Sequence, residues 1–364
     1  MVEKKKSVFR RNSAIIILLL LAIIIKFIAL HPAWIEHYYL PNIYLPVSAV
    51  MRFCFGWLPF SLGDILYALA GGILLINVIL FLRRSLKRQL TKTIFLNSLR
   101  RILIIFLSVY IYFNLSWGLN YNRLGIAYQL KLQTEKYSVA DLKMITEVLV
   151  QKVNNDRGFF IDSIIRIPPY RQLYGQSVDS YKETHKQFPF ISYEYRSIKK
   201  SNYGRLGNYL GFLGYYNPFT GEAQLNLTIP RFVIPFVTCH EMAHQLGYAS
   251  ESEANFVGYL AAVHSTNVLY HYSAYFDMFQ YANIELARRD TAAARINVQR
   301  LSNPVKGDIR QVIEYEKKTE NPLEPIIEIF YDFYLKANQQ EKGVRSYNEV
   351  VGWLIAYYKK YGTI

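Results

Sequence analysis

Three apolar runs dominate the first third of the chain, whereas the remainder mixes apolar and polar positions as a globular protein does. The runs cover residues 14–30, 65–82 and 102–117. A helix that crosses a bilayer needs about 20 apolar residues, so the first two runs are adequate and the third is short. The pattern predicts a membrane anchor of three transmembrane helices in residues 1–117, followed by one folded domain in residues 118–364.

The first run is either an uncleaved anchor or a signal peptide, because five basic residues precede it. No small-x-small cleavage site follows it, which favours the anchor. Lys and Arg then set the orientation, with seven in residues 83–101 and only Arg52 in residues 31–63. By the positive-inside rule, this predicts a multi-pass protein of the bacterial inner (cytoplasmic) membrane with an extracytoplasmic C-terminal domain. The apolar segment 31–63 is expected to lie in the interface or to pack on that domain.

The net charge of +15 would suit a nucleic-acid binder, but its distribution argues against one. Residues 1–117 hold 14 Lys and Arg against 3 acidic residues, a net of +11, while residues 118–364 hold 28 against 24, a net of +4. The excess lies beside the apolar runs, where membrane topology accounts for it. We predict a lipid bilayer as partner and no nucleic acid. Cys54 and Cys239 form no disulfide framework, and Cys239 is expected to be a small buried residue.

Helical periodicity dominates the second part, and a Gly-, Tyr- and Asn-rich stretch interrupts it at residues 190–227. This stretch is predicted to form loops and short strands, with an alternating, half-buried strand at 223–227. Ser138 and Asp141 resemble a capping box. The predicted helices cover residues 138–154, 178–188, 233–246, 251–270, 272–289, 292–301, 306–318, 325–337 and 347–361. The expected fold class is therefore mainly α with a small sheet, and no internal repeat is present.

The motif His240-Glu241-Met242-Ala243-His244 carries the candidate chemistry. Two histidines four residues apart lie on one face of a helix, so both imidazoles reach one metal ion. Glu241 would face the open fourth position, where zinc lowers the pKa of a water to about 7 and the carboxylate accepts its proton. The apolar residues before the motif predict a buried helix, in which unpaired His and Glu side chains would be costly. We predict a Zn²⁺ site with ligands His240 and His244 and with Glu241 as general base.

A third protein ligand is expected from the next helix, because Gly247 ends the motif helix and Ser250 can cap another. Glu251 and Glu253 are both near that start. Glu253 completes a Ser-x-x-Glu capping box, which would occupy its carboxylate. Glu251 is therefore preferred as the ligand, and Asn255, four residues on, could accept a hydrogen bond from a ligand histidine.

The motif together with Glu251-Ser252-Glu253-Ala254-Asn255 resembles the gluzincin class of zinc peptidases. The resemblance implies a zincin-like α+β domain in which the Glu that opens the second helix, here Glu251, is the third ligand. Asn255 departs from the acid common at that place and would leave the histidine less basic. The chain also resembles, over nearly its full length, an uncharacterised bacterial family of membrane-anchored proteins with this motif. That likeness rests on residues 59–67, 117–121, 217–223 and 240–256.

Two supporting features are expected of such a site. An edge strand would align the substrate backbone by strand addition, and residues 221–227 are the best candidate, with a plain structural strand as the alternative. A Tyr or His would steady the oxyanion. The candidates for this role are Tyr215, Tyr216, His264 and Tyr347. His264 and His271 also fit the description of core histidines on an apolar helix.

These observations predict a membrane-anchored zinc-dependent peptidase that acts on a peptide or protein substrate. The alternative is a catalytically silent zinc-binding membrane protein that serves as a sensor or assembly factor. Glu241 favours the enzyme, because a structural zinc site has no use for a base there. An intramembrane protease would need the motif inside a spanning helix, and residues 235–247 leave about three turns, too few to span.

Overall fold

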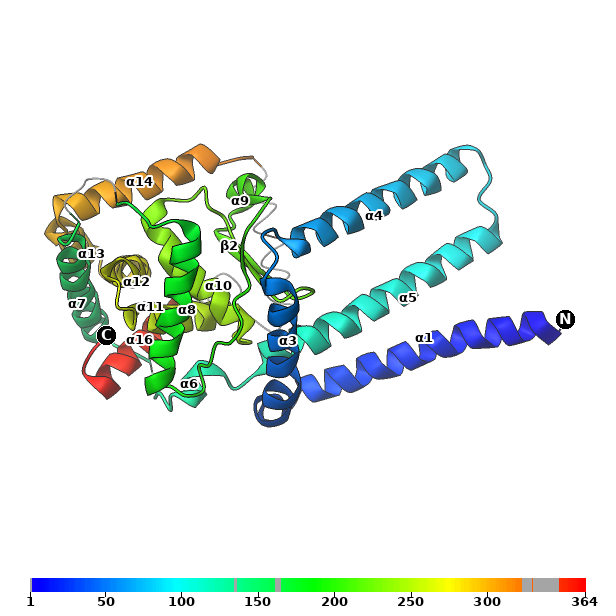
Figure 1. Cartoon of the computed structure of the whole chain (residues 1–364), viewed down its shortest axis with the longest axis horizontal. Helices are drawn as coiled ribbons and strands as arrows, with labels where there is room; N and C mark the ends of the chain where they lie inside the picture. Colours follow the sequence, from blue (N-terminus) through cyan, green and yellow to red (C-terminus); the bar gives the residue numbers. More distant parts are fainter. Residues whose placement is uncertain (1, 134–135, 161–164, 323–328, 330–346) are drawn as a thin grey trace.

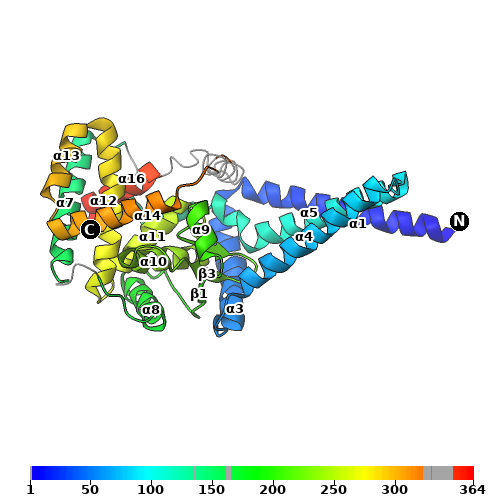
Figure 2. The same cartoon turned by 90° about the horizontal axis from the view of Figure 1, so that it is seen from above.

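The computed structural model describes the chain except for residues 1, 134–135, 161–164, 323–328 and 330–346. Long helices extend from one end of the molecule and a helical domain fills the other, as both views show (Figures 1 and 2). The described part is mainly helical with one small three-stranded sheet, as the sequence predicts.

Three long helices form the extended end: α1 (Val2–Ala29), α4 (Leu62–Leu86) and α5 (Lys92–Ser116). Within the described residues, α4 and α5 are each long and apolar enough to cross a membrane. A third crossing results if Ser13–Ala29 and Pro32–Gly56, which bend by 96° at their junction, count as one broken span. The third apolar run is longer than expected, because Leu96 and Leu99 belong to the same helix. The chain therefore has the features of a membrane protein.

The segment between α1 and α4 is helical and not a loop. It contains α2 (Pro32–Trp34), the π-helix η1 (Ile35–Tyr44) and α3 (Leu45–Gly56). Helix α3 runs across the ends of the long helices (Figure 1). One side of this segment, with Tyr44, Ser48 and Arg52, is buried against the helical domain, while Phe53 and Trp57 are exposed.

The helical domain surrounds two buried helices that carry the candidate metal ligands. Helix α10 (Ile234–Gln245) contains the two histidines, and α11 (Glu251–Val263) packs between α10, α8 (Tyr170–Gln187), α12 (Val268–Arg289) and α16 (Tyr347–Tyr361). The other helices are η2 (Gly118–Asn122), α6 (Gly125–Gln129), α7 (Val139–Arg157), α9 (Gly204–Leu210), η3 (Arg231–Val233), α13 (Thr291–Arg300) and α14 (Asn303–Thr319).

Most predicted helices are present, and two differ in extent. The capping box at Ser138 is formed, and α16 covers 347–361 as predicted. The single helix predicted at 251–270 is wrong: it breaks at 264–267, where the side chain of Asn267 caps the start of α12. Polar residues that bond to nearby backbone compete with helix continuation there. Helix α8 starts at Tyr170 and not at 178, and the predicted helix 325–337 lies almost entirely outside the described residues.

The sheet consists of β1 (Ile198–Lys200), β2 (Gly214–Asn217) and β3 (Glu222–Leu225) in the order β1-β3-β2. Strand β3 pairs in parallel with β1 and antiparallel with β2. The expectation that residues 221–227 form an edge strand is therefore wrong, because β1, which the sequence does not signal, occupies the other side of β3. Strand β2 is an edge of the sheet.

The sheet is attached to the ends of α4 and α5 that lie nearest the helical domain. The ring of Phe219, in the β2–β3 turn, stacks on Tyr112 of α5 with centroids 5.4 Å apart. The carboxylate of Glu222 accepts hydrogen bonds from the backbone N–H groups of Leu62 and Gly63, at 3.0 and 2.7 Å. These groups belong to the first turn of α4, where N–H groups lack partners in the helix itself. Helices α4 and α5 and the domain therefore share contacts across residue 117.

Candidate metal centre

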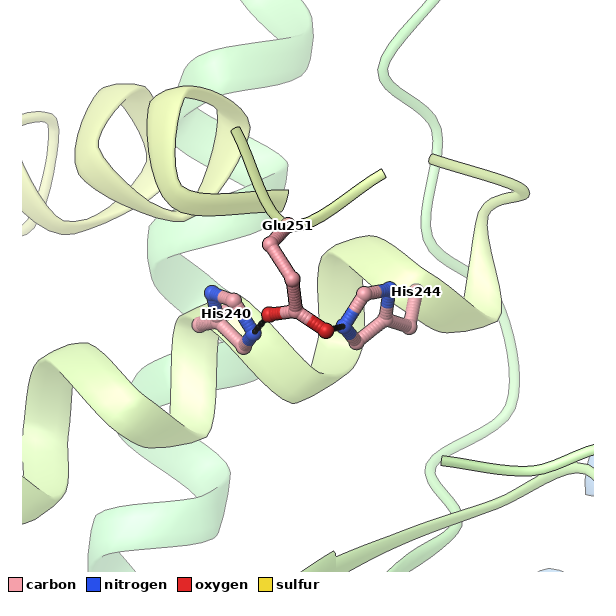
Figure 3. Close-up of side chains that lie close together, drawn as sticks. All are labelled: His240, His244 and Glu251. Carbon is pink, nitrogen blue, oxygen red and sulfur yellow. Dashed lines mark ion pairs between the residues drawn. The ribbon is translucent and has the colours of Figure 1, made fainter. Parts of the chain in front are cut away.

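Close packing of α10 and α11 brings the candidate ligands together. A Cβ atom on Gly258 of α11 would lie 2.8 Å from the backbone nitrogen of His240, so only glycine permits this approach. The two imidazole rings of α10 lie one turn apart, with centroids separated by 4.8 Å. Five residues separate the end of α10 from the start of α11, whose first residue, Glu251, points back at both rings (Figure 3).

The three side chains form one compact donor set (Figure 3). Nε2 of His240 lies 3.3 Å from one carboxylate oxygen of Glu251, and Nε2 of His244 lies 3.9 Å from the other. One ligand atom from each residue lies within 4.8 Å of the other two. Zinc ligands at about 2.0–2.2 Å in tetrahedral geometry are about 3.3 Å apart, so a small adjustment would suit the ion.

Glu253 turns away from this donor set. Its carboxylate accepts a hydrogen bond from the N–H of Ile126 at 2.9 Å, and its own N–H donates to Ser250 at 3.2 Å. Gly125 has a positive φ of 77° there, and any side chain on it would overlap the Glu253 carboxylate. Of the two carboxylates that the sequence leaves open, only Glu251 is placed beside the histidines.

The second nitrogen of His244 has a fixed partner that sequence reasoning misses. Nδ1 of His244 lies 2.7 Å from the carbonyl oxygen of Tyr248, so this nitrogen carries the proton and donates. Nε2 then keeps its lone pair, which is the arrangement that metal-bound histidines require. Gly247, with a φ of 83°, turns the chain so that this carbonyl faces the ring. A Gly directly after the motif helix is the only sequence signal for this contact.

The second nitrogen of His240 differs from that of His244. Its Nδ1 is buried without a hydrogen-bond partner at normal distance among the described residues. Asn255, the expected acceptor, is buried nearby and helps to raise the pKa of His240 through its side chain. Asp277 of α12, which the sequence did not single out, has a buried oxygen without a partner in the described part of the chain. Burial raises the pKa of Asp277 to about 6, although the charge of His240 opposes the shift.

The ionisation of the site reflects burial and mutual charge. Burial favours the neutral ring of His240, but the hydrogen bond to Glu251 and the negative charges of Glu241 and Glu251 outweigh it and raise the pKa to about 9. Burial and the charge of His240 lower the pKa of His244 to about 4. At neutral pH, one histidine of the metal-free protein is therefore protonated and the other is ready to bind a cation.

Glu241 occupies a buried position against the edge strand. The residue is only 3 % exposed. Its Oε2 has no hydrogen-bond partner among the described residues. Burial raises the pKa of Glu241 to about 8. A Cβ on Gly214 of β2 would lie 2.6 Å from Oε1, so the glycine leaves room for the carboxylate. An unpaired buried oxygen is costly for stability and typical of a group kept for chemistry.

The candidate residues for steadying the oxyanion form no described hydrogen bond with His240, His244 or Glu251. The hydroxyl of Tyr215 donates to Asp64, and that of Tyr216 accepts from Tyr44 at 3.4 Å. His264 is held by the carbonyl of Leu260 and by Gln187, both at 2.7 Å, but it is only partly buried at the end of α11 and is not a core histidine. The side chain of Tyr347 lies outside the described residues.

The remaining sequence expectations concern side chains outside the donor set. Nε2 of His271 lies 2.6 Å from the carbonyl oxygen of Ser265, so the ring has a partner, although it is only partly buried and not in the core. Cys239 is buried and Cys54 is exposed, and neither forms a disulfide. Cys239 is therefore a small buried residue, as predicted.

The fold and the site define a membrane protein with a helical domain and a candidate metal centre built from two helices. The chain belongs to the family described as "Protein of unknown function (DUF3810)", which matches residues 39–355. No curated protein and no solved structure matches it. The family match covers the last six residues of η1, all of α3 and the whole donor set, and its description states no activity.

Proposed function

We propose that this protein is a membrane-anchored zinc peptidase that hydrolyses peptide bonds outside the cytoplasmic membrane. One observation carries the proposal: His240, His244 and Glu251 converge beside a buried Glu241 whose carboxylate has an oxygen without a partner in the described structure. Two imidazoles and one carboxylate are the donor set of catalytic zinc sites that keep a fourth position open. The gluzincin resemblance of the sequence points the same way.

Bound zinc would supply Lewis-acid activation of water and of the substrate carbonyl. The residues of the chain then have separate roles. His240, His244 and Glu251 hold the ion. Glu241 accepts the proton of the attacking water and delivers it to the leaving amine, the two transfers of general base and general acid. We assign alignment of the substrate backbone to the edge strand β2, which packs against Glu241 through Gly214.

The proposed location follows the distribution of basic residues. Lys and Arg are concentrated before α1 and between α4 and α5, which favours a cytoplasmic side for those segments. The domain and its metal centre then lie outside the membrane. Helix α10 has 12 residues, too few to span a bilayer, which argues against cleavage inside it.

The test compares cells that produce the wild-type protein with cells that produce Glu241→Gln, by mass spectrometry of membrane and extracytoplasmic peptides. The proposal predicts fragments that depend on Glu241 and that disappear when zinc is chelated. Identical peptide sets, with zinc bound in both proteins, would favour the catalytically silent sensor or assembly factor.

The affinity for zinc should increase with pH between 7 and 9. The pKa of His240 is raised to about 9, so its proton competes with the metal throughout this range. Each pH unit should therefore strengthen apparent binding by up to about tenfold. His244, with its pKa lowered to about 4, adds no dependence there. Chelator competition at pH 7, 8 and 9 measures the effect, and a flat or falling affinity would contradict it.

Gly214→Ala should reduce cleavage while zinc stays bound. The added Cβ would lie 2.6 Å from Oε1 of Glu241 and 2.9 Å from the backbone carbonyl oxygen of Gln224 on β3, so both the carboxylate and the strand must shift. Misplacing a catalytic group by about 1 Å can cost about 100-fold in rate. Gly175→Ala is the matched control, because a Cβ there meets nothing within 4 Å. Steady-state kinetics and the zinc content of both variants test whether cleavage is lost while zinc stays bound. An unchanged rate for Gly214→Ala would show that the strand does not position Glu241.

A further inference from the structure

Side chains from outside the domain core bind the carbonyl groups at the end of α10. The last carbonyls of a helix lack partners within it and are satisfied by water or side chains. Here the hydroxyl of Tyr44 donates to the carbonyl of His244 at 3.2 Å, and Ser48 and Arg52 donate to that of Gln245 at 2.9 and 3.0 Å. The three donors come from η1 and α3, the helices that follow α1. The membrane-proximal segment therefore holds the end of the motif helix.

The loop after α10 is held by a buried ion pair that also reaches this segment. Arg123 donates to the carbonyl of Gly247 at 2.8 Å. The same guanidinium binds both carboxylate oxygens of Glu36, at 3.1 and 3.2 Å, and covers the ring of Tyr248 at 4.7 Å. Gln129 closes the network, donating to Glu36 and accepting from the Tyr248 hydroxyl, both at 2.8 Å. Both sides of the ion pair are almost fully buried, with side chains 1 % and 6 % exposed.

This network ends on the zinc-binding side chain of His244. The carbonyl of Tyr248 is the acceptor that fixes Nδ1 of His244 and leaves Nε2 toward Glu251. Arg123 holds Tyr248 through its ring and through the preceding carbonyl, and Gln129, which is bonded to Glu36, holds its hydroxyl. Loss of the pair would allow this loop to move, and His244 would lose the partner that sets its tautomer and orientation.

We propose that Glu36 and Arg123 are positioning residues for the metal, so that the juxtamembrane helix η1 controls the zinc affinity of the domain. This inference rests on the proposed zinc site and deepens it. Partners of metal ligands in other sites typically contribute 10–100-fold to metal affinity. The geometry of the metal centre would then depend on residues from both sides of the predicted domain boundary at residue 117, in the membrane-proximal segment and in the domain.

A matched control exists within the same domain. Arg157 and Asp308 form a second buried ion pair at 2.6 Å, with the same exposed fractions of 1 % and 6 %. It links α7 to α14 and makes none of the described contacts with α10 or its following loop. Glu36→Gln and Asp308→Asn therefore remove equally buried carboxylate charges, one in the network that reaches His244 and one without a described contact to α10 or its loop.

The experiment measures the zinc dissociation constant of full-length wild type, Glu36→Gln and Asp308→Asn in detergent, by chelator competition. Thermal unfolding of the metal-free proteins and the visible spectrum of the cobalt-loaded proteins are recorded in parallel. Both variants should unfold at lower temperature, but only Glu36→Gln should weaken zinc binding, by about 10-fold or more, and change the cobalt spectrum. Tyr248→Phe, which loses only the hydroxyl, should weaken zinc binding several-fold. It replaces Glu36→Gln in the test if that variant does not fold.

Two results would overturn the inference. Glu36→Gln or Tyr248→Phe could bind zinc within twofold of the wild type, or Asp308→Asn could weaken binding equally. Failure of the proposed function has a different signature, because the wild-type protein itself would then bind no zinc at all or cleave no peptide.

Discussion

Replacing Glu241 by Gln is expected to leave zinc bound and to reduce peptide cleavage by about 10²–10⁴-fold, the usual contribution of a general base. Glutamine has nearly the same shape and fits beside Gly214, but it cannot accept the proton of the attacking water. The three residues that hold the ion are unchanged. Steady-state kinetics on a peptide cleaved by the wild type, with zinc content measured on the same sample, tests both halves of the expectation.

Glu285→Gln is a suitable control, because Glu285 is also buried but pairs with Arg289 on α12 and lies outside the donor set. That variant should retain its activity. Turnover by Glu241→Gln at the wild-type rate would refute the general-base role. Loss of zinc from Glu241→Gln would mean that the residue is needed for the metal and not only for proton transfer.

The second large effect is expected at the start of α11, where Glu251 is the proposed zinc ligand and Glu253 has a structural role. Glu251→Ala should lower zinc affinity by more than about 100-fold, beyond the effect of an outer contact, because it removes a ligand. Glu253→Ala should keep zinc but lower the free energy of unfolding by about 1–3 kcal/mol, since the N–H of Ile126 loses its buried acceptor. Zinc titration and chemical denaturation of both variants separate the two roles.

The reverse pattern would show that the third ligand is Glu253. Equal, small effects on zinc in both variants would indicate a site with only two protein ligands. Either result would require α11 to sit differently against α10 than the contact of Gly258 with His240 implies.

Features that depend on nearby residues could be predicted from the sequence. The spacing of His240 and His244 fixes their common face, and the capping roles of Ser138 and Ser250 follow from residues three positions on. The apolar runs identify the long helices, and Gly247 marks the end of α10. The sequence prefers Glu251 because a capping box is expected to occupy Glu253. Ser250 does cap α11, but the Glu253 carboxylate accepts from the distant N–H of Ile126 and not from the backbone of Ser250.

Features that depend on distant partners could not be predicted. Strand β1 has only three residues and carries little strand signal, so the sequence alone predicts β3 as an edge. The acceptor of His244 is a backbone carbonyl, which any residue at position 248 would supply. Glu36 and Arg123 are 87 positions apart, and only the bend between α1 and η1 brings them together.

The zinc content of the purified full-length protein tests the central claim most directly. Wild-type protein, after dialysis against metal-free buffer, should carry about one zinc per chain by mass spectrometry of the metal. The double variant His240→Ala and His244→Ala should carry none and should still fold, as judged by circular dichroism. Equal zinc in both, or none in the wild type, would contradict a metal centre at His240, His244 and Glu251.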